Sequence, residues 1–484
     1  MAQSIISNTA ISGTGRVITI LLGVATTAVV TRYLGVASFG SYTLLLSIST
    51  ILQIAADFGL YLTLTRDISK PDAQEQHIFG TISALRLVLV GGLFILVGAG
   101  MAIIPQYRPL LIPFIVITAG ITAQSLSQLL MGVYQKYKEV WKATIGDVVG
   151  RIAQLLIILA VVRAIPANTI PQSTAVLWVT IAFFVGAVLA YILHALFVPK
   201  INAWRWNISV GQWKVLAKNS WPLGLLLLLN VVYFRTDVII ISIFRPQVEV
   251  GWYGLAYRII ESGLFFPAMF GGLLLPQLSL LFAKKHIPPI AELLEQATRL
   301  VGIAGFLAAG ALLVFAEDII VFLSGVEFVS AAPLLRVLAV ALGIMFVGNI
   351  FGFALIAFHK QKQLLTLYGL LVVLNLTTNL IFVPIWGAAA AAWTTLITEA
   401  TATLGAGYLV SRMVPLSIPT KPLLLCGAVL LFSAGIGGIL PASWHVLLRL
   451  AIFSSLYISG AVCVGLITRD NIHLLLSKKL PHEA

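Results

Sequence analysis

Ionisable side chains inside long apolar runs are the residues of this chain that could do chemistry. Five of them are arginines, at Arg16, Arg86, Arg151, Arg235 and Arg258. A charge at the centre of a membrane-spanning helix costs roughly 2.5–3.5 kcal/mol on insertion scales, so each is expected to face a cavity or a partner. Guanidinium is planar, always charged and donates to two oxygens at once, which suits phosphate. The arginines therefore predict binding of an anionic, phosphate-bearing group.

Five acids lie in the same kind of run and are the expected partners of these arginines. They are Asp57, Asp147, Asp237, Glu261 and Glu399. Their two alternative roles are internal pairing and coupling to a proton or a sodium ion. For ion coupling the candidates are Asp57, Asp237 and Glu399.

The spacing of these residues allows specific internal pairs. Asp147 and Arg151 are four residues apart, and one turn of helix brings them together. Arg258 and Glu261, three residues apart, have the same relation. Arg16 and Asp57 are expected at similar depth on adjacent helices. For any one arginine, pairing and substrate contact stay open as alternatives.

Polar residues recur on single helix faces. Asp147, Arg151 and Gln154 share one face of their run, at intervals of three and four residues. Arg235 and Asp237, by contrast, are about 200° apart around a helix. Together these patterns predict a wet, polar, net-positive cavity between two halves of the chain, lined at least by the first, second, fifth, seventh and eighth spans.

The composition is that of a polytopic membrane protein. The 484 residues are 60% hydrophobic and 10% charged, with a mean hydropathy of +1.03. Soluble domains are about 45–50% apolar and about 25% charged, so a soluble enzyme, a disordered chain and a nucleic-acid binder are excluded. No phosphate-binding loop motif and no metal-ligand spacing occurs, and the histidines, His194 included, are scattered at loops and span ends. We expect no enzyme, no cofactor, no metal and no nucleic-acid partner.

Fourteen apolar runs have spanning length. They lie at 10–31, 39–62, 79–104, 110–133, 143–162, 176–198, 220–243, 253–282, 297–316, 333–358, 364–384, 388–410, 422–440 and 444–467. With both termini in the cytoplasm, 18 of the 30 lysines and arginines fall on the cytoplasmic side and 4 on the outer side. This bias agrees with the positive-inside rule, so the chain is predicted to be N-in and C-in.

An internal repeat relates two halves of the chain. A shift of 211 residues aligns four pairs, Asn8 with Asn219, Gly13 with Gly224, Gly40 with Gly251 and Tyr42 with Tyr253. In both halves a helix runs into a short outer loop, and Gly-x-Tyr then opens the next helix. Each half has six spans, and because this number is even, both halves enter the membrane in the same direction. The repeat therefore predicts two parallel lobes with a site between them.

The repeat divides the chain into four parts. They are an N-lobe at 1–198, a cytoplasmic interfacial linker at 199–219, a C-lobe at 220–410, and two further spans with a tail at 411–484. Trp204, Trp206 and Trp213 alternate with basic residues in the linker, as is typical of a segment lying on the membrane surface. In the eighth span, Pro267 and Pro276 predict a bent helix.

The first seventy residues carry a family signature. Arg32-Tyr33-Leu34-Gly35-x-x-x-Phe39-Gly40-x-Tyr42, then Asp57-Phe58-Gly59-Leu60 and Arg66-Asp67, resembles the N-terminal signature of Wzx-like polysaccharide flippases of the multidrug/oligosaccharidyl-lipid/polysaccharide exporter superfamily. The resemblance implies export of an undecaprenyl-diphosphate-linked oligosaccharide from the inner to the outer leaflet of the bacterial inner membrane, by alternating access. The implied partners are this lipid-linked anionic oligosaccharide, membrane lipids and polysaccharide polymerase or assembly proteins.

Three other functions are weighed against this one. A lipid II flippase is less favoured, because that family carries more arginines along its first span than the single Arg16. A multidrug/cation antiporter should have an acidic cavity. A membrane glycosyltransferase or polymerase needs acidic catalytic residues on a sizeable outer loop, and none is present.

Overall fold

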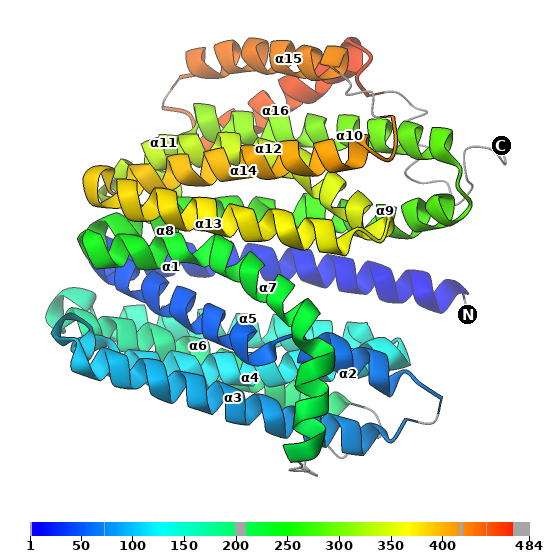
Figure 1. Cartoon of the computed structure of the whole chain (residues 1–484). Helices are drawn as coiled ribbons and strands as arrows, with labels where there is room; N and C mark the ends of the chain where they lie inside the picture. Colours follow the sequence, from blue (N-terminus) through cyan, green and yellow to red (C-terminus); the bar gives the residue numbers. More distant parts are fainter. Residues whose placement is uncertain (1, 72, 199–209, 416–419, 442, 468–484) are drawn as a thin grey trace. The chain divides into compact units, whose positions relative to one another are not determined.

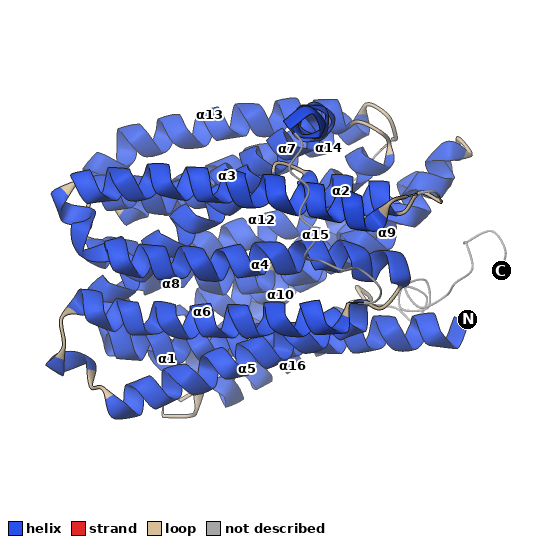
Figure 2. Ribbon diagram, turned by 90° about the horizontal axis from the view of Figure 1, so that it is seen from below, coloured by secondary structure: helices blue, strands red, loops and turns tan. Residues whose placement is uncertain are grey.

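The computed structural model describes residues 2–71, 73–198, 210–415, 420–441 and 443–467. Helices connected by short turns make up these ranges, and they contain no strand (Figure 2). This confirms the all-helical prediction. Two of the tryptophans of the predicted linker, Trp204 and Trp206, lie outside the described residues.

Sixteen helices and three short 3-10 turns follow one another along the described part of the chain (Figure 1). They are α1 (Ala2–Asp57), α2 (Leu60–Ile68), α3 (Glu75–Ile103), η1 (Pro105–Leu110), α4 (Leu111–Tyr137), α5 (Val140–Ala164), η2 (Ala167–Thr169), α6 (Gln172–Phe197), α7 (Val210–Phe244), α8 (Gln247–Gly263), α9 (Phe265–Ala283), α10 (Ile287–Val314), α11 (Ala316–Ser324), η3 (Val326–Ala331), α12 (Ala332–Ala357), α13 (Gln361–Trp386), α14 (Ala388–Ser411), α15 (Thr420–Ile439) and α16 (Val446–Cys463).

Twelve helical segments of the described chain are long and apolar enough to cross a membrane. One of them, Gly13–Asp57, has 45 residues. At about 1.5 Å per residue it is on the order of twice as long as the ~30 Å hydrocarbon core, so it holds two spans. In addition, α14 has 24 residues and reaches spanning length without being one of the twelve. The chain is a multi-pass membrane protein, and the number fourteen and the orientation stay predictions.

The two spans in α1 are joined at Gly35, where the backbone leaves the helical region (φ 67, ψ 177). The expected outer loop is therefore absent from this described segment, and Gly40-x-Tyr42 lies inside the second arm of α1 instead of opening it. A single glycine suffices for the change of direction, because it adopts positive φ without steric cost.

The predicted eighth span is also interrupted. Helix α8 ends at Gly263 and α9 begins at Phe265. The interruption has a local cause, because Pro267 has no N–H to donate to the carbonyl of Gly263, four residues earlier. Pro276 is accommodated within α9.

The chain forms two compact units, Met1–Gly251 and Trp252–Ala484. In the first unit, α6 packs on α4 and α5, while α1 packs on α5 and α7. Helix α7, predicted as the first helix of the C-lobe, groups with the first unit through its contacts with α1, α2 and α3. The lobe boundaries drawn from the repeat stay a prediction.

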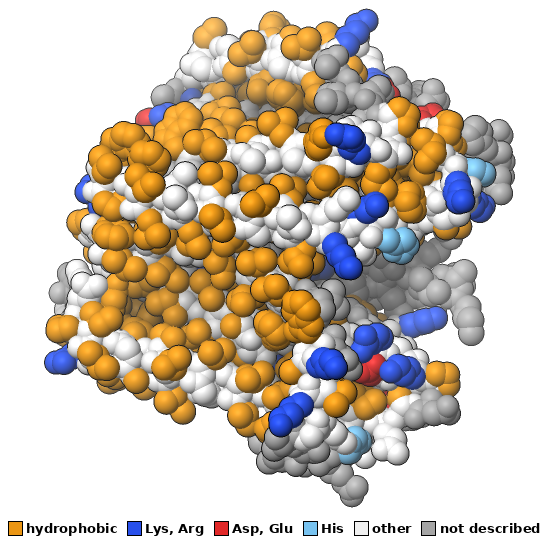
Figure 3. All heavy atoms as spheres, in the orientation of Figure 1, with side chains coloured by type: hydrophobic (Ala, Val, Ile, Leu, Met, Phe, Trp, Pro, Cys, Tyr) orange, Lys and Arg blue, Asp and Glu red, His pale blue; other side chains and the backbone are white. Residues whose placement is uncertain are grey.

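In the second unit, α12 contacts α9, α10 and α14, and α13 packs on α14. Helix α13 has two different faces. Leu370, Val373 and Leu380 are exposed, whereas Asn375 and Asn379 are buried. Figure 3 shows hydrophobic side chains spread over the face of the molecule on which Figure 1 draws α13. Such exposed apolar faces are expected of helices in contact with lipid.

Candidate functional site

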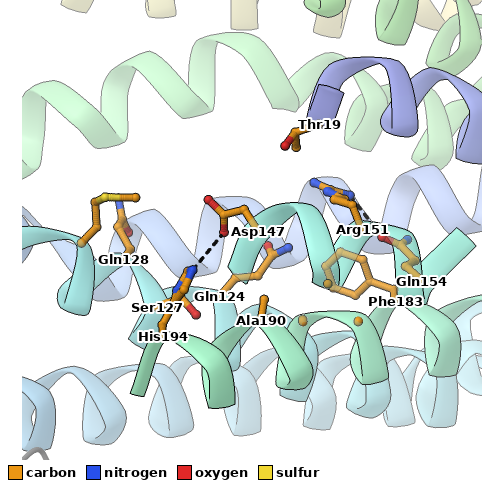
Figure 4. Close-up of a pocket in the computed structure, with 14 residues that line it drawn as sticks. Thr19, Gln124, Ser127, Gln128, Asp147, Arg151, Gln154, Phe183, Ala190 and His194 are labelled. Carbon is orange, nitrogen blue, oxygen red and sulfur yellow. Dashed lines mark hydrogen bonds and ion pairs between the residues drawn. The ribbon is translucent and has the colours of Figure 1, made fainter. Parts of the chain in front are cut away.

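A cavity of about 310 Å³ lies within the first unit, among α1, α4, α5 and α6 (Figure 4). Its wall is formed by Thr19 from α1, Gln124, Ser127, Gln128 and Met131 from α4, Asp147, Gly150, Arg151 and Gln154 from α5, and Phe183, Gly186, Ala187, Ala190 and His194 from α6. Within α4 and within α5 these residues follow intervals of three and four, so each helix presents one continuous face. The cavity is therefore built from helix faces, not from loops.

Helix α5 contributes the face that the sequence predicts. Asp147, Arg151 and Gln154 all line the cavity (Figure 4). The helix can lie close to α6 because two glycines face each other. A Cβ atom on Gly150 would lie 2.6 Å from the carbonyl oxygen of Gly186, and one on Gly186 would lie 2.7 Å from that of Gly150. Small residues at such contacts are typical of helix packing in membranes.

His194 forms part of the cavity wall on α6. Its Nε2 lies 2.8 Å from the carbonyl oxygen of Ala143 and 3.5 Å from Oδ1 of Asp147. A carbonyl only accepts, so Nε2 carries a proton and donates it to Ala143. Nδ1 is buried without a hydrogen-bond partner in the described chain. The Asp147 side chain is 46% exposed, so this carboxylate remains accessible.

Arg151 lies one helical turn beyond Asp147. Its NH1 donates to Oε1 of Gln154 at 3.2 Å (Figure 4). The guanidinium is half-buried at the cavity wall. A partly accessible guanidinium beside a carboxylate and several amides can bind a polar ligand from more than one side.

A fully buried ion pair lies behind the cavity. NH1 of Arg86 is 3.0 Å from Oδ1 of Asp57, with side-chain exposures of 0% and 2%. NH2 of Arg86 donates to Oε1 of Gln128 at 2.8 Å, and Oδ1 of Asp57 accepts from the backbone N–H of Tyr61. Asp57, expected as a partner of Arg16, thus pairs with Arg86 instead. Internal pairing and substrate contact were the two alternatives for Arg86, and in this structure Arg86 is internally paired.

The other predicted residues of the first unit do not line this cavity. Arg16 is exposed on α1, Arg235 is half-buried on α7, and Asp237, two residues further on, is buried. Their substrate-binding and ion-coupling roles stay predictions.

Three predicted residues belong to the second unit. NH1 of Arg258 lies 3.9 Å from Oε2 of Glu261, and their side chains are 40% and 27% exposed. This is a loose version of the pair expected from the sequence. Glu399 is buried on α14.

Sequence reasoning identified the functional candidates only in part. The sequence places His194 at a span end, and it does lie in the last turn of α6, but its burial in the cavity wall was not predicted. Its contact with Ala143 joins residues 51 positions apart, which no local pattern reveals. The polar residues Gln124, Ser127 and Gln128 of α4, which break the apolar run at 110–133, all line the cavity.

The family signature has a structural explanation. In Asp57-Phe58-Gly59, the carboxylate binds Arg86, and Gly59 has a positive φ of 81° that starts α2. The carboxylate of Asp67 forms ion pairs with Arg66 at 3.1 Å and with Lys70 at 2.9 Å. Partial burial opposes ionisation of Asp67, but these hydrogen bonds and charges outweigh it and lower its pKa.

No group of histidine, cysteine, aspartate and glutamate in the described residues could hold a metal ion. Instead, the first unit offers a polar cavity inside apolar helices, with an ion pair behind it. An ionisable residue at membrane depth marks a pathway or a binding site by default.

The family model for polysaccharide biosynthesis proteins matches residues 5–282. The chain belongs to this family. The match includes residues 5–251 of the first unit and with them every residue of the cavity.

One curated relative of this family member is a probable low-salt glycan biosynthesis flippase, Agl15, from Haloferax volcanii. The two are 28% identical over 207 residues, which is 42% of this chain. The chain spans only 43% of that relative's length.

Solved structures support the same fold. A lipid II flippase, MurJ, in an inward closed conformation has a TM-score of 0.79 at 13% identity, covering 95% of this chain and 99% of its own. An inward-facing multidrug resistance transporter of the MATE family has a TM-score of 0.65 at 16% identity, covering 82% and 94%. At these identities the likeness shows the fold alone.

Proposed function

We propose that this protein is a transporter that moves a lipid-diphosphate-linked oligosaccharide from the inner to the outer leaflet of a bacterial cytoplasmic membrane, by alternating access of its two lobes. The observation that carries the proposal is the cavity of the first unit, with Arg151 and Asp147 in its wall, in a chain of the polysaccharide biosynthesis family. The relative from Haloferax volcanii, named as a probable glycan biosynthesis flippase, supports the same substrate class.

The diphosphate is the part of the substrate that the in-span arginines would bind. Arg16, Arg151, Arg235 and Arg258 are the candidates, since none of them is as deeply buried as Arg86. Guanidinium groups bind phosphate oxygens in pairs, and a set of them holds the headgroup without requiring one fixed pose.

The membrane potential favours this direction of transport. The cytoplasm is electrically negative, and each negative charge that crosses outward gains about 2.3 kcal/mol per 100 mV. Headgroup transfer driven in this way needs no coupled ion. If coupling exists, Asp237 and Glu399 are the carboxylates we propose for it, because Asp57 is held by Arg86. The exported glycan would then pass to polymerase or assembly proteins.

The test is a leaflet-translocation assay with the purified protein in proteoliposomes. Undecaprenyl-diphosphate-linked glycan is supplied in one leaflet, with and without an imposed potential, and its appearance in the other is measured. Arg16→Ala, Arg151→Ala and Arg258→Ala should each abolish translocation. Arg163→Ala is the matched control, because Arg163 is exposed on the same helix as Arg151 and is expected to leave the rate unchanged.

The same assay separates the alternatives. A lipid II flippase would move lipid II faster than other diphosphate-linked glycans. A multidrug antiporter would move rhodamine 6G, a ligand present in one structurally similar MATE transporter, DinF-BH. Normal glycan translocation by all three arginine variants would contradict the proposed role of the in-span arginines in binding the substrate.

A further inference from the structure

We infer that the cavity among α1, α4, α5 and α6 is a subsite for one uncharged sugar ring of the glycan. Of the four candidate arginines, Arg151 then contacts this sugar, and Arg16, Arg235 and Arg258, which do not line the cavity, are left for the diphosphate. The inference rests on the proposed function, because it takes the transported molecule to be a lipid-linked glycan. It adds a specificity-determining site within a single unit of the chain.

The charge of the cavity wall argues for a neutral ligand. The lining residues include one carboxylate, Asp147, and one guanidinium, Arg151. The guanidinium already donates to Gln154. A diphosphate would bring its negative charges next to the accessible carboxylate of Asp147, and like charges at such distances repel. An uncharged ligand avoids this repulsion and still finds strong hydrogen-bond groups.

The remaining polar groups match a molecule rich in hydroxyls. Gln124, Gln128 and Gln154 place three side-chain amides on the wall. The oxygens of Gln128 and Gln154 already accept from Arg86 and Arg151, so these two amides offer chiefly their –NH2 donors, and Gln124 offers both a donor and an acceptor. A sugar hydroxyl both donates and accepts, so alternating amide, carboxylate and hydroxyl groups can satisfy several hydroxyls of one ring. A site of this kind rejects analogues that lack the hydroxyl, because its own polar groups would be left unpaired.

Two deeply buried polar atoms of the wall lack a partner in the described structure. They are Oγ of Ser127, a residue 8% exposed, and Nδ1 of His194, a residue 1% exposed. Buried polar atoms are nearly always hydrogen-bonded, so an unpaired one calls for an explanation. Both belong to residues that line the cavity. Neither atom is itself accessible in this conformation, so an occupant reaches it only after a side-chain movement. For Ser127 a rotation about χ1 is enough to turn the hydroxyl toward a sugar hydroxyl in the cavity.

The apolar part of the cavity wall and the volume of the cavity both fit a single sugar ring. Phe183, Met131, Ala187 and Ala190 supply apolar surface against which the C–H face of a pyranose can pack. The volume of about 310 Å³ is at the lower end of the range for ligand pockets, about 300–1,000 Å³. It suits a single ring rather than a whole oligosaccharide repeat unit.

The experiment uses the full-length protein and a glycan without phosphate or lipid. Mild acid releases the free oligosaccharide from the lipid-linked pool of the source organism, and its binding is followed by saturation-transfer NMR titration. We expect binding with a dissociation constant at or below about 1 mM. The transferred saturation should be concentrated in the protons of one sugar ring.

Two cavity variants and one matched control localise the binding. Gln124→Leu should weaken glycan binding tenfold or more, and Ser127→Ala about two- to tenfold, as expected for loss of one or two hydrogen bonds. Ser125→Ala is the control, because Ser125 is on the same helix, is also buried with an unpaired hydroxyl, and does not line the cavity. It should leave binding unchanged. Thermal unfolding of each variant identifies any that fails to fold, and Ser127→Ala against Ser125→Ala remains the deciding pair.

Absence of free-glycan binding to the wild type would overturn the inference. So would equal effects of Ser127→Ala and Ser125→Ala, or saturation spread evenly over all rings. Failure of the proposed function gives a different result. Translocation would then be missing from proteoliposomes, while the free glycan still bound and the two cavity variants still weakened it.

Discussion

The buried ion pair between α1 and α3 in the first unit differs in kind from the amide and hydroxyl bonds inside α13 and α14 in the second. In the first unit, Asp57 and Arg86 form an ion pair between two helices, and the side chains of both residues are fully buried. In the second, Nδ2 of Asn379 donates to Oδ1 of Asn375 at 3.1 Å, and Thr398 donates to the carbonyl of Thr394. These are neutral groups that bond within one helix.

The difference indicates how strongly each region depends on the correct placement of its helices relative to one another. A neutral group bonded four residues away is satisfied before helices meet, and its removal disturbs one helix. An ion pair between helices is satisfied only when both helices are correctly placed, and loss of one partner leaves an uncompensated charge. The first unit should therefore be the more sensitive to single substitutions.

The largest effect is expected for Arg86→Ala. It leaves Asp57 charged and buried without its partner, and we expect a loss of about 3–5 kcal/mol in the free energy of unfolding. Thermal unfolding in detergent, read by size-exclusion fluorescence, measures it. The double variant Arg86→Met with Asp57→Leu should recover most of the loss. If the double variant were as unstable as Arg86→Ala, the ion pair would not be the cause.

A smaller effect is expected from helix packing. Gly150→Ala places a Cβ 2.6 Å from the carbonyl oxygen of Gly186, and overpacking of this kind costs about 1–3 kcal/mol. Gly272→Ala in α9 of the second unit is the control, because a Cβ there meets no atom within 4 Å. Its unfolding midpoint should be unchanged or slightly raised, since alanine favours helix. Equal losses in the two variants would contradict the close contact of α5 and α6.

Asn375→Ala tests the same comparison with a variant in the second unit. It removes the acceptor of Asn379, and hydrogen bonds inside membrane proteins contribute on average about 0.6 kcal/mol and at most about 1.7. The expected loss is thus several-fold below that of Arg86→Ala in the same unfolding assay. A loss as large as that of Arg86→Ala would abolish the distinction between the two regions.

The smallest effect on stability is expected for Asp147→Asn. Its side chain is 46% exposed, and the change keeps the size, so the free energy of unfolding should move by no more than about 0.5 kcal/mol. Glycan translocation in proteoliposomes should nevertheless fall strongly, because the accessible carboxylate belongs to the proposed sugar subsite. Unchanged translocation would separate Asp147 from that subsite.

The architecture was predictable because hydropathy determines helix existence in a membrane. The one-residue break at Gly35 was not, since a loop and a single positive-φ glycine leave similar patterns in a sequence. The polar face of α5 was predictable from its spacing alone. The partner of Asp57 was not, because spacing gives a side chain's depth and face but not which neighbouring helix meets it, and Arg86 on α3 occupies the place assigned to Arg16. The contact of His194 with Ala143 depends on the same unknown packing.

Gln128 stands between the ion pair and the cavity, and this position fixes the polarity of one part of the wall. Its amide oxygen is held by Arg86, so the amide cannot flip without breaking a charge-assisted bond. The –NH2 end is then the one left for an occupant. A donor facing the cavity is thus imposed by a guanidinium that never reaches it, and exchanging Arg86 for a neutral residue would free the amide to rotate and reverse what it offers.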